Sequence, residues 1–350
     1  MTTHVNGYTA PAELADLAGL RYVNDDEPGC ARKPWGRGFT YYDEKGKRVT
    51  DQERRQTFEA LVIPPAWTDV WICASHDGHV QATGRDEKGR KQYIYHPRWE
   101  EVRDQVKYER LAEFGETLPQ LRDQVAQDLR SRSLSQRKVT ALVVRLLDET
   151  LLRIGNESYV EENGSYGLTT LQKEHATISG SHLNFSFLGK SGKEQEVILR
   201  NKRLASLVQR CQELPGQHLF QYTGEDGELH AISSTLVNDY LREWIGQDFT
   251  AKKFRTWGAT VAAATRLVEL GEPETEEIAK TNLVAAVKHA AELLGNTPAV
   301  CRQYYLHPAI EAAYKDGALI ATIDDIQSGK GARKEGLSEM ETAVLSLLQS

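Results

Sequence analysis

Four short stretches of the sequence carry side chains suited to cleaving a phosphodiester by transesterification. They are Arg153-Ile154-Gly155-Asn156, Phe187-Leu188-Gly189-Lys190, Arg255-Thr256-Trp257-Gly258, and Gly295-Asn296-Thr297-Pro298 followed by Tyr304-Tyr305. The planar fork of arginine pairs with two phosphate oxygens and keeps its charge. A lysine ammonium protonates the leaving oxygen, and a tyrosine oxygen attacks once neighbouring cations help its phenolate to form. Together these residue types predict a metal-free phosphodiester transesterase.

Taken one at a time, each of these residues has a structural explanation. An arginine at a helix end, such as Arg153, usually forms a surface ion pair or interacts with the helix dipole. Lys190 in a turn is usually only solvated, and Tyr304 and Tyr305 suit packing in a short helix. Asn296 fits a junction between two helices. Their joint occurrence, in this order along the chain, favours the catalytic interpretation.

The spacing of apolar residues predicts the elements that carry these side chains. A helical period over residues 142–154 indicates a helix that ends at Gly155-Asn156, with Arg153 at its end and off the buried face. Strict alternation over 183–188 indicates a strand of a three-stranded sheet, with Lys190 at the tip of the following turn. Further helices are expected at about 201–213, 234–245, 252–270 and 274–294, in short segments after Pro298, and at 337–348.

The first 106 residues are predicted to form short strands instead of long helices. Strands are expected at 70–72, 79–83 and 93–95, with a hairpin loop at 84–91. We therefore predict an α+β protein. It has a β-rich domain over 1–106, a mostly helical domain with a three-stranded sheet over 107–321 that carries all four stretches, and a linker with a short helix over 322–350. A chain of 350 residues is long enough for two such cores.

Composition sets the broad class of the protein. A content of 40% hydrophobic and 27% charged residues is typical of a globular protein. The net charge of −7 argues only mildly against a nucleic-acid partner. Four scattered cysteines form no CxxC pair, so no zinc site or disulfide framework is expected. Without a signal peptide or a long apolar run, we expect a soluble, intracellular protein that does not enter a membrane.

With these motifs the sequence resembles type IB DNA topoisomerases of the compact, poxvirus-like bacterial kind, over about residues 20 to 320. In that family the first active-site arginine lies in R-x-G-[NK], here Arg153. The lysine follows aromatic-x-Gly at a β-hairpin, here Lys190, and the second arginine lies in K-x-x-R-T-[YW], here Arg255. The nucleophile comes nine residues after the G-[HN]-T-P position, which selects Tyr305 over Tyr304.

Asn296 departs from the family pattern, since many members carry histidine at this position. The role ascribed to that histidine is donating a hydrogen bond to a non-bridging phosphate oxygen, and an asparagine amide also donates. The resemblance thus implies the catalytic set of Tyr305, Arg153, Lys190, Arg255 and Asn296.

The same resemblance implies residues that contact duplex DNA. The segment 84–95 is similar to the family strand that enters the major groove. There Gln92 would read a base edge, Tyr93 and Tyr95 would contact bases or phosphate, and Arg90 and Lys91 would neutralise backbone charge. Tyr159 and Lys252 are further candidates. The alternative is an exposed hairpin with ordinary aromatic cross-strand packing.

The activity implied by the resemblance is relaxation of supercoiled duplex DNA without ATP, metal or any other cofactor. A single strand is cleaved through a 3′-phosphotyrosyl intermediate and then religated. The enzyme would be a cytoplasmic, nucleoid-associated monomer that clamps DNA between its two domains. A tyrosine recombinase is the nearest alternative, but recombinases favour H-x-x-R where this chain has Lys252 three residues before Arg255. A catalytically silent duplex-DNA-binding protein is the other alternative.

Overall fold

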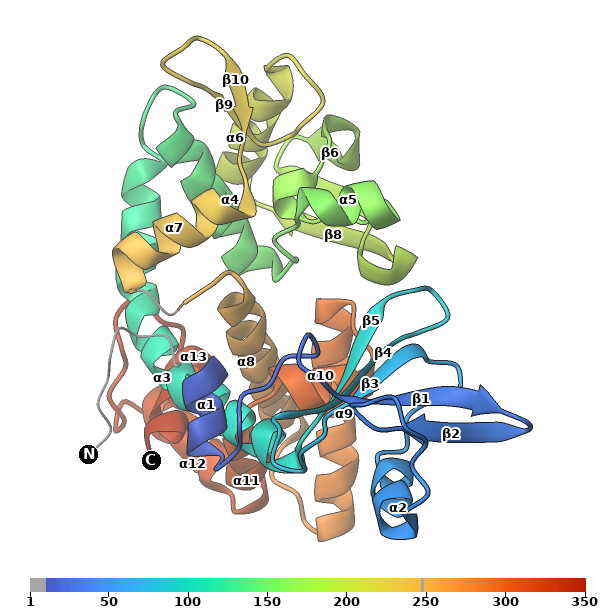
Figure 1. The fold of residues 1–350 in the computed structure, drawn as a ribbon. Helices are drawn as coiled ribbons and strands as arrows, with labels where there is room; N and C mark the ends of the chain where they lie inside the picture. Colours follow the sequence, from blue (N-terminus) through green and yellow to red (C-terminus); the bar gives the residue numbers. More distant parts are fainter. Residues whose placement is uncertain (1–10, 247–248) are drawn as a thin grey trace. The chain divides into compact units, whose positions relative to one another are not determined.

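Five antiparallel strands near the N-terminus form a sheet in the order β2-β1-β3-β4-β5 in the computed structural model (Figure 1). The structure describes residues 11–246 and 249–350, except for the side chains of 104–107 and 109. It contains two compact units, Tyr8–Glu109 and Arg110–Ser350. We call the first the sheet unit and the second the catalytic unit, and we describe each by itself. The domain boundaries given above stay a prediction.

The sheet unit is built from short strands because Pro, Gly and turn residues interrupt the chain. Its elements are α1 (Pro11–Leu17), β1 (Cys30–Trp35), β2 (Gly38–Tyr42), α2 (Gln52–Ala60), β3 (Thr68–Ile72), β4 (Val80–Arg85), β5 (Lys91–Tyr95) and the first part of α3 (Pro97–Asp128). One face of the sheet buries Cys30, Val70, Ile72 and Ala82 against Phe58 of α2. The expected hairpin between β4 and β5 is present, with its turn at residues 86–90.

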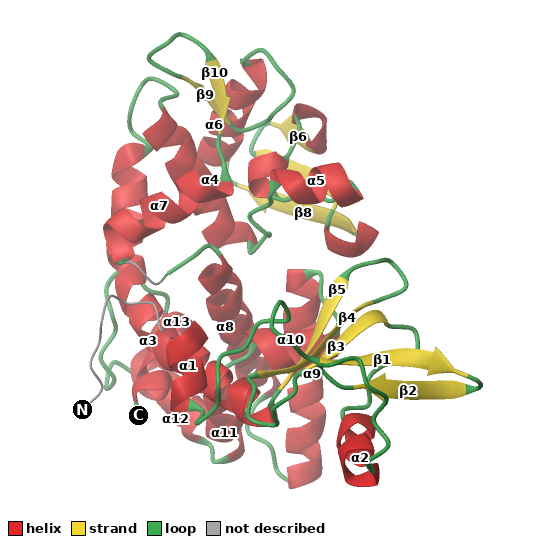
Figure 2. Ribbon diagram, in the orientation of Figure 1, coloured by secondary structure: helices red, strands yellow, loops and turns green. Residues whose placement is uncertain are grey.

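The catalytic unit is mostly helical and holds a second, three-stranded sheet (Figure 2). Its helices are the rest of α3, α4 (Gln136–Thr150), α5 (Glu157–Asn163), α6 (Lys202–Glu213), α7 (Ser234–Ile245), α8 (Lys252–Leu270), α9 (Glu276–Leu294), α10 (Pro298–Tyr305), α11 (Pro308–Lys315), α12 (Ala318–Gln327) and α13 (Glu339–Gln349). Its strands are β6 (Ala176–Ser179), β7 (His182–Leu188) and β8 (Glu194–Arg200), with a separate β9–β10 pair (Gln221–Thr223, Leu229–Ala231). The predicted α+β class and the three-stranded sheet are confirmed.

One helix ends earlier than the apolar pattern predicts. Helix α4 stops at Thr150, and Leu151 adopts a left-handed conformation with φ 56°. A side chain on Gly258 of α8 would clash with Leu151, since a Cβ there would lie 2.4 Å from Leu151 Cδ2. The tight approach of α8 therefore favours the turn, whereas the expected end at Gly155-Asn156 was wrong. Asn156 instead caps the next helix, accepting a bond from the Ser158 amide at 3.1 Å.

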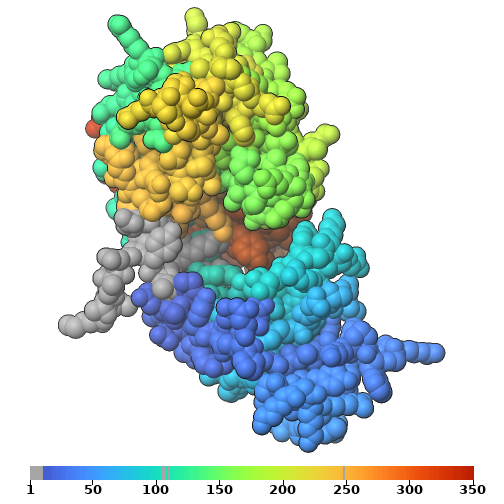
Figure 3. All heavy atoms as spheres, turned by 45° about the horizontal axis from the view of Figure 1, so that its top comes forward, coloured from blue at the N-terminus to red at the C-terminus, as the bar shows by residue number. Residues whose placement is uncertain are grey.

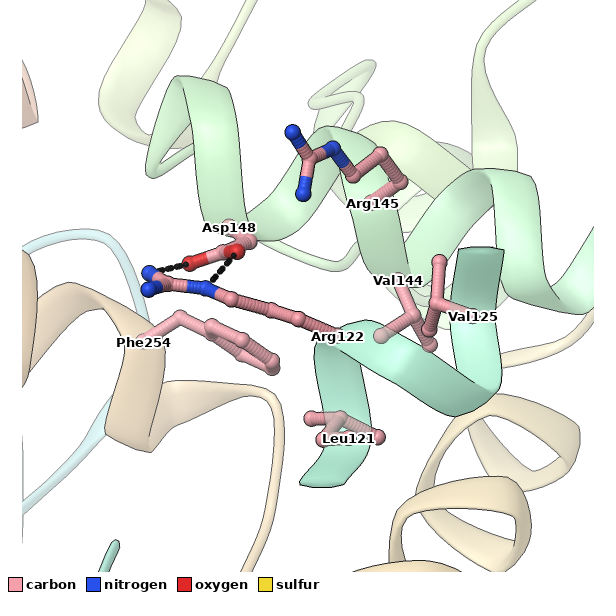
Figure 4. Close-up of a pocket in the computed structure, with 7 residues that line it drawn as sticks. All are labelled: Leu121, Arg122, Val125, Val144, Arg145, Asp148 and Phe254. Carbon is pink, nitrogen blue, oxygen red and sulfur yellow. Dashed lines mark hydrogen bonds and ion pairs between the residues drawn. The ribbon is translucent and has the colours of Figure 1, made fainter. Parts of the chain in front are cut away.

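The C-terminal helix α13 is held in the catalytic unit by a cluster of charged side chains around Arg122, whose bonds to Asp148 are drawn in Figure 4. Arg122 of α3 donates to Asp148 of α4 at 2.8 and 3.0 Å and to Glu341 of α13 at 2.7 and 3.1 Å. The same Glu341 carboxylate accepts the indole N–H of Trp257, from α8, at 3.2 Å. Residues 322–350 thus pack on the helices that carry the candidate site described below. The small pocket beside Arg122 is lined by none of the candidate catalytic residues.

We expect Glu341→Gln to lower the free energy of unfolding by about 1–3 kcal/mol, the usual cost of leaving a buried charged partner unsatisfied. Burial raises the pKa of Glu341, but Arg122 outweighs it and holds the pKa below its ordinary value. The stabilisation is therefore present above the unfolded pKa and is lost as the pH falls through the folded pKa. Urea unfolding at neutral pH measures the loss.

Glu339→Gln is the matched control, since Glu339 lies on the same helix and pairs with the exposed Arg333 at 3.3 Å. Exposed pairs contribute little, so its effect should stay within about 0.5 kcal/mol. Equal effects of the two substitutions would show that the Arg122 cluster does not anchor α13.

Candidate active site

Arg255 lies near the start of α8 with its guanidinium deep in the catalytic unit, and the residue is only 4% exposed. Two backbone carbonyls hold it, those of Leu151 and of Leu294, the latter at 2.9 Å. Both carbonyls belong to helix ends, where carbonyl groups lack helical partners. Burial, followed by the charge of Arg153, lowers the pKa of Arg255 to about 10. The side chain therefore remains a cation at neutral pH.

Tyr305 is the last residue of α10, a short helix with Thr297 as N-cap and Pro298 in its first turn. The guanidinium carbon of Arg255 lies 5.2 Å from the centre of the Tyr305 ring. The backbone there is fixed by the fully buried Thr260 of α8. Its hydroxyl accepts the His307 amide at 3.2 Å, and its one proton is shared between the Thr256 carbonyl at 2.8 Å and the Tyr305 carbonyl at 3.2 Å. Tyr305 is thus held against α8 beside a buried cation.

The electrostatic surroundings of Tyr305 favour its phenolate. Burial alone raises the pKa of this hydroxyl, but Arg255, through its charge and a hydrogen bond, opposes burial, and Arg153 and Lys252 add to the effect. The net result is a pKa below the ordinary value. The neighbouring Tyr304 is half-buried on the same helix.

Arg153 reaches the site from the segment between α4 and α5. Its guanidinium donates to Asn296 Oδ1 at 2.5 Å. The segment is fixed by backbone bonds from Leu168 to the Arg153 carbonyl at 2.9 Å and from Thr169 to the Ile154 carbonyl at 2.7 Å. Such close pairing requires glycine on both sides, since a Cβ on Gly167 would lie 2.5 Å from the Gly155 nitrogen. Arg153, Asn296, Arg255 and Tyr305 therefore form one cluster.

Two buried hydrogen-bond donors in this cluster have no partner among the described residues, Asn296 Nδ2 and Arg255 Nε. Leaving a buried donor unsatisfied costs free energy, so such groups call for an explanation. Both belong to a site that also concentrates the charges of Arg153 and Arg255. This combination suits a bound anion whose oxygens accept from these donors.

Lys190 lies outside this cluster. It begins a 3₁₀ turn between β7 and β8, at the tip of the hairpin as expected, and is exposed. No hydrogen bond or ion pair of its ammonium is present in the described part of the chain. Gln195 of β8 connects the hairpin with the cluster. Cβ atoms on Gly189 and Gly295 would lie 2.8 and 2.5 Å from Gln195 Cγ and Oε1, respectively.

The predicted DNA-contact residues Arg90, Lys91 and Gln92, at the turn before β5 and at its start, have acidic partners. Arg90 pairs with Asp86 at 2.7 Å, and Gln92 donates to the same carboxylate at 3.0 Å. Lys91 pairs with Asp25 at 2.6 Å. These bonds hold the three side chains in defined positions.

The predicted aromatic contacts differ in exposure. Tyr93 is 45% exposed and stacks on the half-buried Tyr95, with ring centres 5.8 Å apart. Tyr95 also stacks on the buried Trp99. In the catalytic unit, Tyr159 is 60% exposed on α5, and Lys252 is exposed at the first position of α8. The roles of all these residues toward DNA stay predictions.

Sequence reasoning missed the residues that position the cluster. Thr260, Gln195 and the Leu151 carbonyl have no motif of their own, because their effect depends on contacts between distant segments. Gly258, which follows the second arginine motif and leaves room for Leu151, is the one feature of that motif from which close packing could have been inferred.

Comparisons with known proteins find matches in both the N-terminal and the C-terminal part of the chain. Residues 96–325 match the family model "Eukaryotic DNA topoisomerase I, catalytic core", and residues 38–86 match "Bacterial DNA topoisomerase IB, N-terminal domain". DNA topoisomerase 1B of Acanthamoeba polyphaga mimivirus is 31% identical over 285 residues, covering 79% of this chain and 85% of that protein.

Two more distant relatives extend the comparison. DNA topoisomerase 1B of vaccinia virus is 22% identical over 237 residues, covering 67% of this chain and 72% of that protein. DNA topoisomerase 1 of Homo sapiens is 25% identical over 202 residues, which cover 55% of this chain and 25% of the human protein. With a bacterial N-terminal domain, a matching catalytic core and poxvirus-like relatives, the chain belongs to the type IB DNA topoisomerase family.

Proposed function

We propose that this enzyme relaxes supercoiled duplex DNA through a covalent tyrosyl intermediate. Tyr305 attacks the phosphorus of one strand, its oxygen forms a bond to the 3′-phosphate, and the bond to the 5′-oxygen breaks. The released 5′-hydroxyl later attacks the phosphotyrosyl bond and restores the strand. The pair of unpartnered buried donors, Asn296 Nδ2 and Arg255 Nε, beside a tyrosine of lowered pKa carries this proposal.

Each residue of the site has a chemical task in this reaction. Arg153 and Arg255 hold the phosphate oxygens and stabilise the negative charge that develops in the transition state. Asn296 donates its unpaired N–H to a non-bridging oxygen. Lys190, at the hairpin tip outside the cluster, moves to the phosphate when DNA binds and protonates the leaving 5′-oxygen.

The covalent bond conserves the energy of the phosphodiester, so the proposed cycle needs neither ATP nor a metal ion nor another cofactor. Rotation of the free end releases supercoils before religation. In this account the enzyme acts as a monomer that clamps duplex DNA between its two units, in the cytoplasm and on the nucleoid. No described helix is long and apolar enough to cross a membrane.

The proposal is tested by incubating pure protein with supercoiled plasmid in EDTA and without ATP. A ladder of relaxed topoisomers is the expected result. Resolution only between paired specific sites would instead indicate a recombinase. Gel retardation with no change in linking number would indicate a silent DNA-binding protein.

We expect Asn296→Ala to slow strand cleavage by roughly 10²–10³-fold, the usual effect of removing one oxyanion donor. The substitution also removes the acceptor that orients Arg153. Asn296→His should retain most of the rate, because an imidazole N–H can replace the amide donor. Single-turnover cleavage of a labelled duplex measures both variants. A histidine variant as slow as the alanine variant would remove donation to the phosphate from the role of this position.

A further inference from the structure

The β1–β2 hairpin of the sheet unit presents an exposed face of alternating cations and aromatic rings. Cross-strand register pairs Lys33 with Thr40 and Trp35 with Gly38, so these residues share a face with Tyr42. Arg48, which follows β2, bridges back to Tyr42 and covers this face. We call Lys33, Trp35, Tyr42 and Arg48 the hairpin face. Figures 1 and 3 show the hairpin projecting from the rest of its unit.

Each cation of the hairpin face lies over an aromatic ring. The guanidinium carbon of Arg48 is 5.0 Å from the centre of the Trp35 ring, and its Nε donates to Thr40 Oγ1 at 3.2 Å. The ammonium of Lys33 is 5.1 Å from the centre of the Tyr42 ring. Trp35 is nevertheless 60% exposed. Such a large exposed aromatic side chain at the end of a hairpin is available to a binding partner.

The opposite face of the hairpin is fixed to its own unit. Arg32 is buried there and donates to the carbonyls of Ile63 at 2.7 Å and Pro64 at 2.8 Å. Its guanidinium carbon also lies 4.1 Å from the centre of the Phe39 ring. Because these bonds anchor one side, the hairpin face is held outward.

The positive charge of this region is not neutralised by its own acids. Residues 30–50 contain the bases Arg32, Lys33, Arg37, Lys45, Lys47 and Arg48 but only the acids Asp43 and Glu44. Asp43 accepts the backbone amides of Lys45 at 3.0 Å and Lys47 at 2.7 Å. Glu44 pairs with Arg54 of α2 at 3.0 Å.

Within the described residues, Lys33, Arg37 and Arg48 therefore have no carboxylate partner. Arg90, in the turn before β5, and Lys91 of β5 differ in this respect, since each has a carboxylate partner. Unpaired cations concentrated on a protein of net charge −7 give a local field that attracts a polyanion.

We infer that the hairpin face is a second DNA-binding surface of this enzyme, which binds the phosphate backbone of the duplex at a distance from β5. The inference rests on duplex DNA being the substrate. β2 and β5 are opposite edges of one sheet, four strand spacings or about 19 Å apart. Along a duplex that distance corresponds to about 6 base pairs. Lys33 and Arg48 supply the charge, and Trp35 and Tyr42 hold both cations in place.

The test compares Lys33→Ala/Arg48→Ala with Arg21→Ala/Arg55→Ala in binding of duplexes of increasing length. Arg21 is exposed and Arg55 half-buried in the same unit, and both already have carboxylate partners, at 3.7 and 3.8 Å. The hairpin variant should lower the log–log salt slope by about 2, at about 0.9 per phosphate, and weaken binding of long duplexes roughly tenfold. The control variant removes the same number of charges and should change neither quantity.

Duplex length gives a second readout that a folding defect would not produce. The difference between wild type and the hairpin variant should vanish once the duplex is shortened by about 6 base pairs on the side that reaches the hairpin. Lys33→Gln/Arg48→Gln, which keeps the side-chain stems, should behave like the alanine variant. An unchanged slope, an equal loss in the control, or weakened binding of single strands alone would overturn the inference.

Plasmid relaxation by the wild-type preparation separates this inference from the proposed function. If the wild type does not relax plasmid, the proposed function fails. If it relaxes plasmid while the hairpin variant keeps the wild-type salt slope, only the second surface fails.

Discussion

Tyr305→Phe should abolish covalent protein–DNA adducts and plasmid relaxation while leaving non-covalent DNA binding close to that of the wild type. Only the attacking oxygen is removed, so the site loses its nucleophile and keeps its cations. The ring remains beneath Arg255, so the packing of α10 on α8 should persist. Adducts trapped on a labelled duplex and resolved under denaturing conditions measure the loss.

Tyr304→Phe is the control, since it removes a hydroxyl from the adjacent residue of the same helix. It should retain adduct formation. If Tyr304→Phe is the inactive variant and Tyr305→Phe still cleaves, the nucleophile has been assigned one residue too late and the proposed roles of Arg255 and Thr260 fail with it.

Lys190→Ala should slow cleavage of ordinary DNA by roughly 10²–10⁴-fold, the usual contribution of a positioned general acid. A duplex with sulfur in place of the 5′-bridging oxygen should largely restore the rate, because its leaving group does not need the proton. The measurement is single-turnover cleavage of the two substrates side by side.

Lys193→Ala provides a matched control, because Lys193 is exposed in the same turn and its backbone carbonyl accepts the Gly189 amide at 2.8 Å. Loss of charge near DNA would affect both variants, whereas loss of the proton donor affects Lys190→Ala alone. Equal slowing of Lys190→Ala on the oxygen and sulfur substrates would exclude proton donation by this residue.

Much of the architecture could be predicted because its patterns are local. The alternation over 183–188 predicted β7, and the helical periods predicted α6 to α9 to within about two residues. The end of α4 was wrong because a tertiary contact, Leu151 against Gly258, determines it. A local sequence pattern cannot predict a turn that is set by the packing of another helix.

The candidate site, too, was predictable in its residue types and not in its contacts between distant segments. Residue types and their order predicted which side chains would carry the chemistry, and the structure brings Arg153, Arg255, Asn296 and Tyr305 together. The sequence did not predict that Asn296 would accept from Arg153 with one amide atom and keep the other unpartnered. That arrangement depends on Gly295 ending α9 in a left-handed turn beside Gln195.

The ion pairs at the start of β5 also could not be predicted from the sequence. Asp25 and Lys91 are 66 residues apart, and only the folded sheet unit brings them within 2.6 Å. The predicted basic strand is therefore less positive than its sequence suggests, while the β1–β2 hairpin carries unpaired charge that its sequence alone did not identify.

The central claim is that Tyr305 forms a bond to a 3′-phosphate, and one measurement tests it directly. The covalent complex is trapped on a duplex from which the released fragment, the one that carries the 5′-hydroxyl, diffuses away. The protein is then digested, and the DNA-linked peptide is sequenced by mass spectrometry. The account predicts a nucleotide attached through its 3′-phosphate to Tyr305, together with a free 5′-hydroxyl on the released strand. A 5′-phosphate linkage, or a linkage to any other residue, would contradict it.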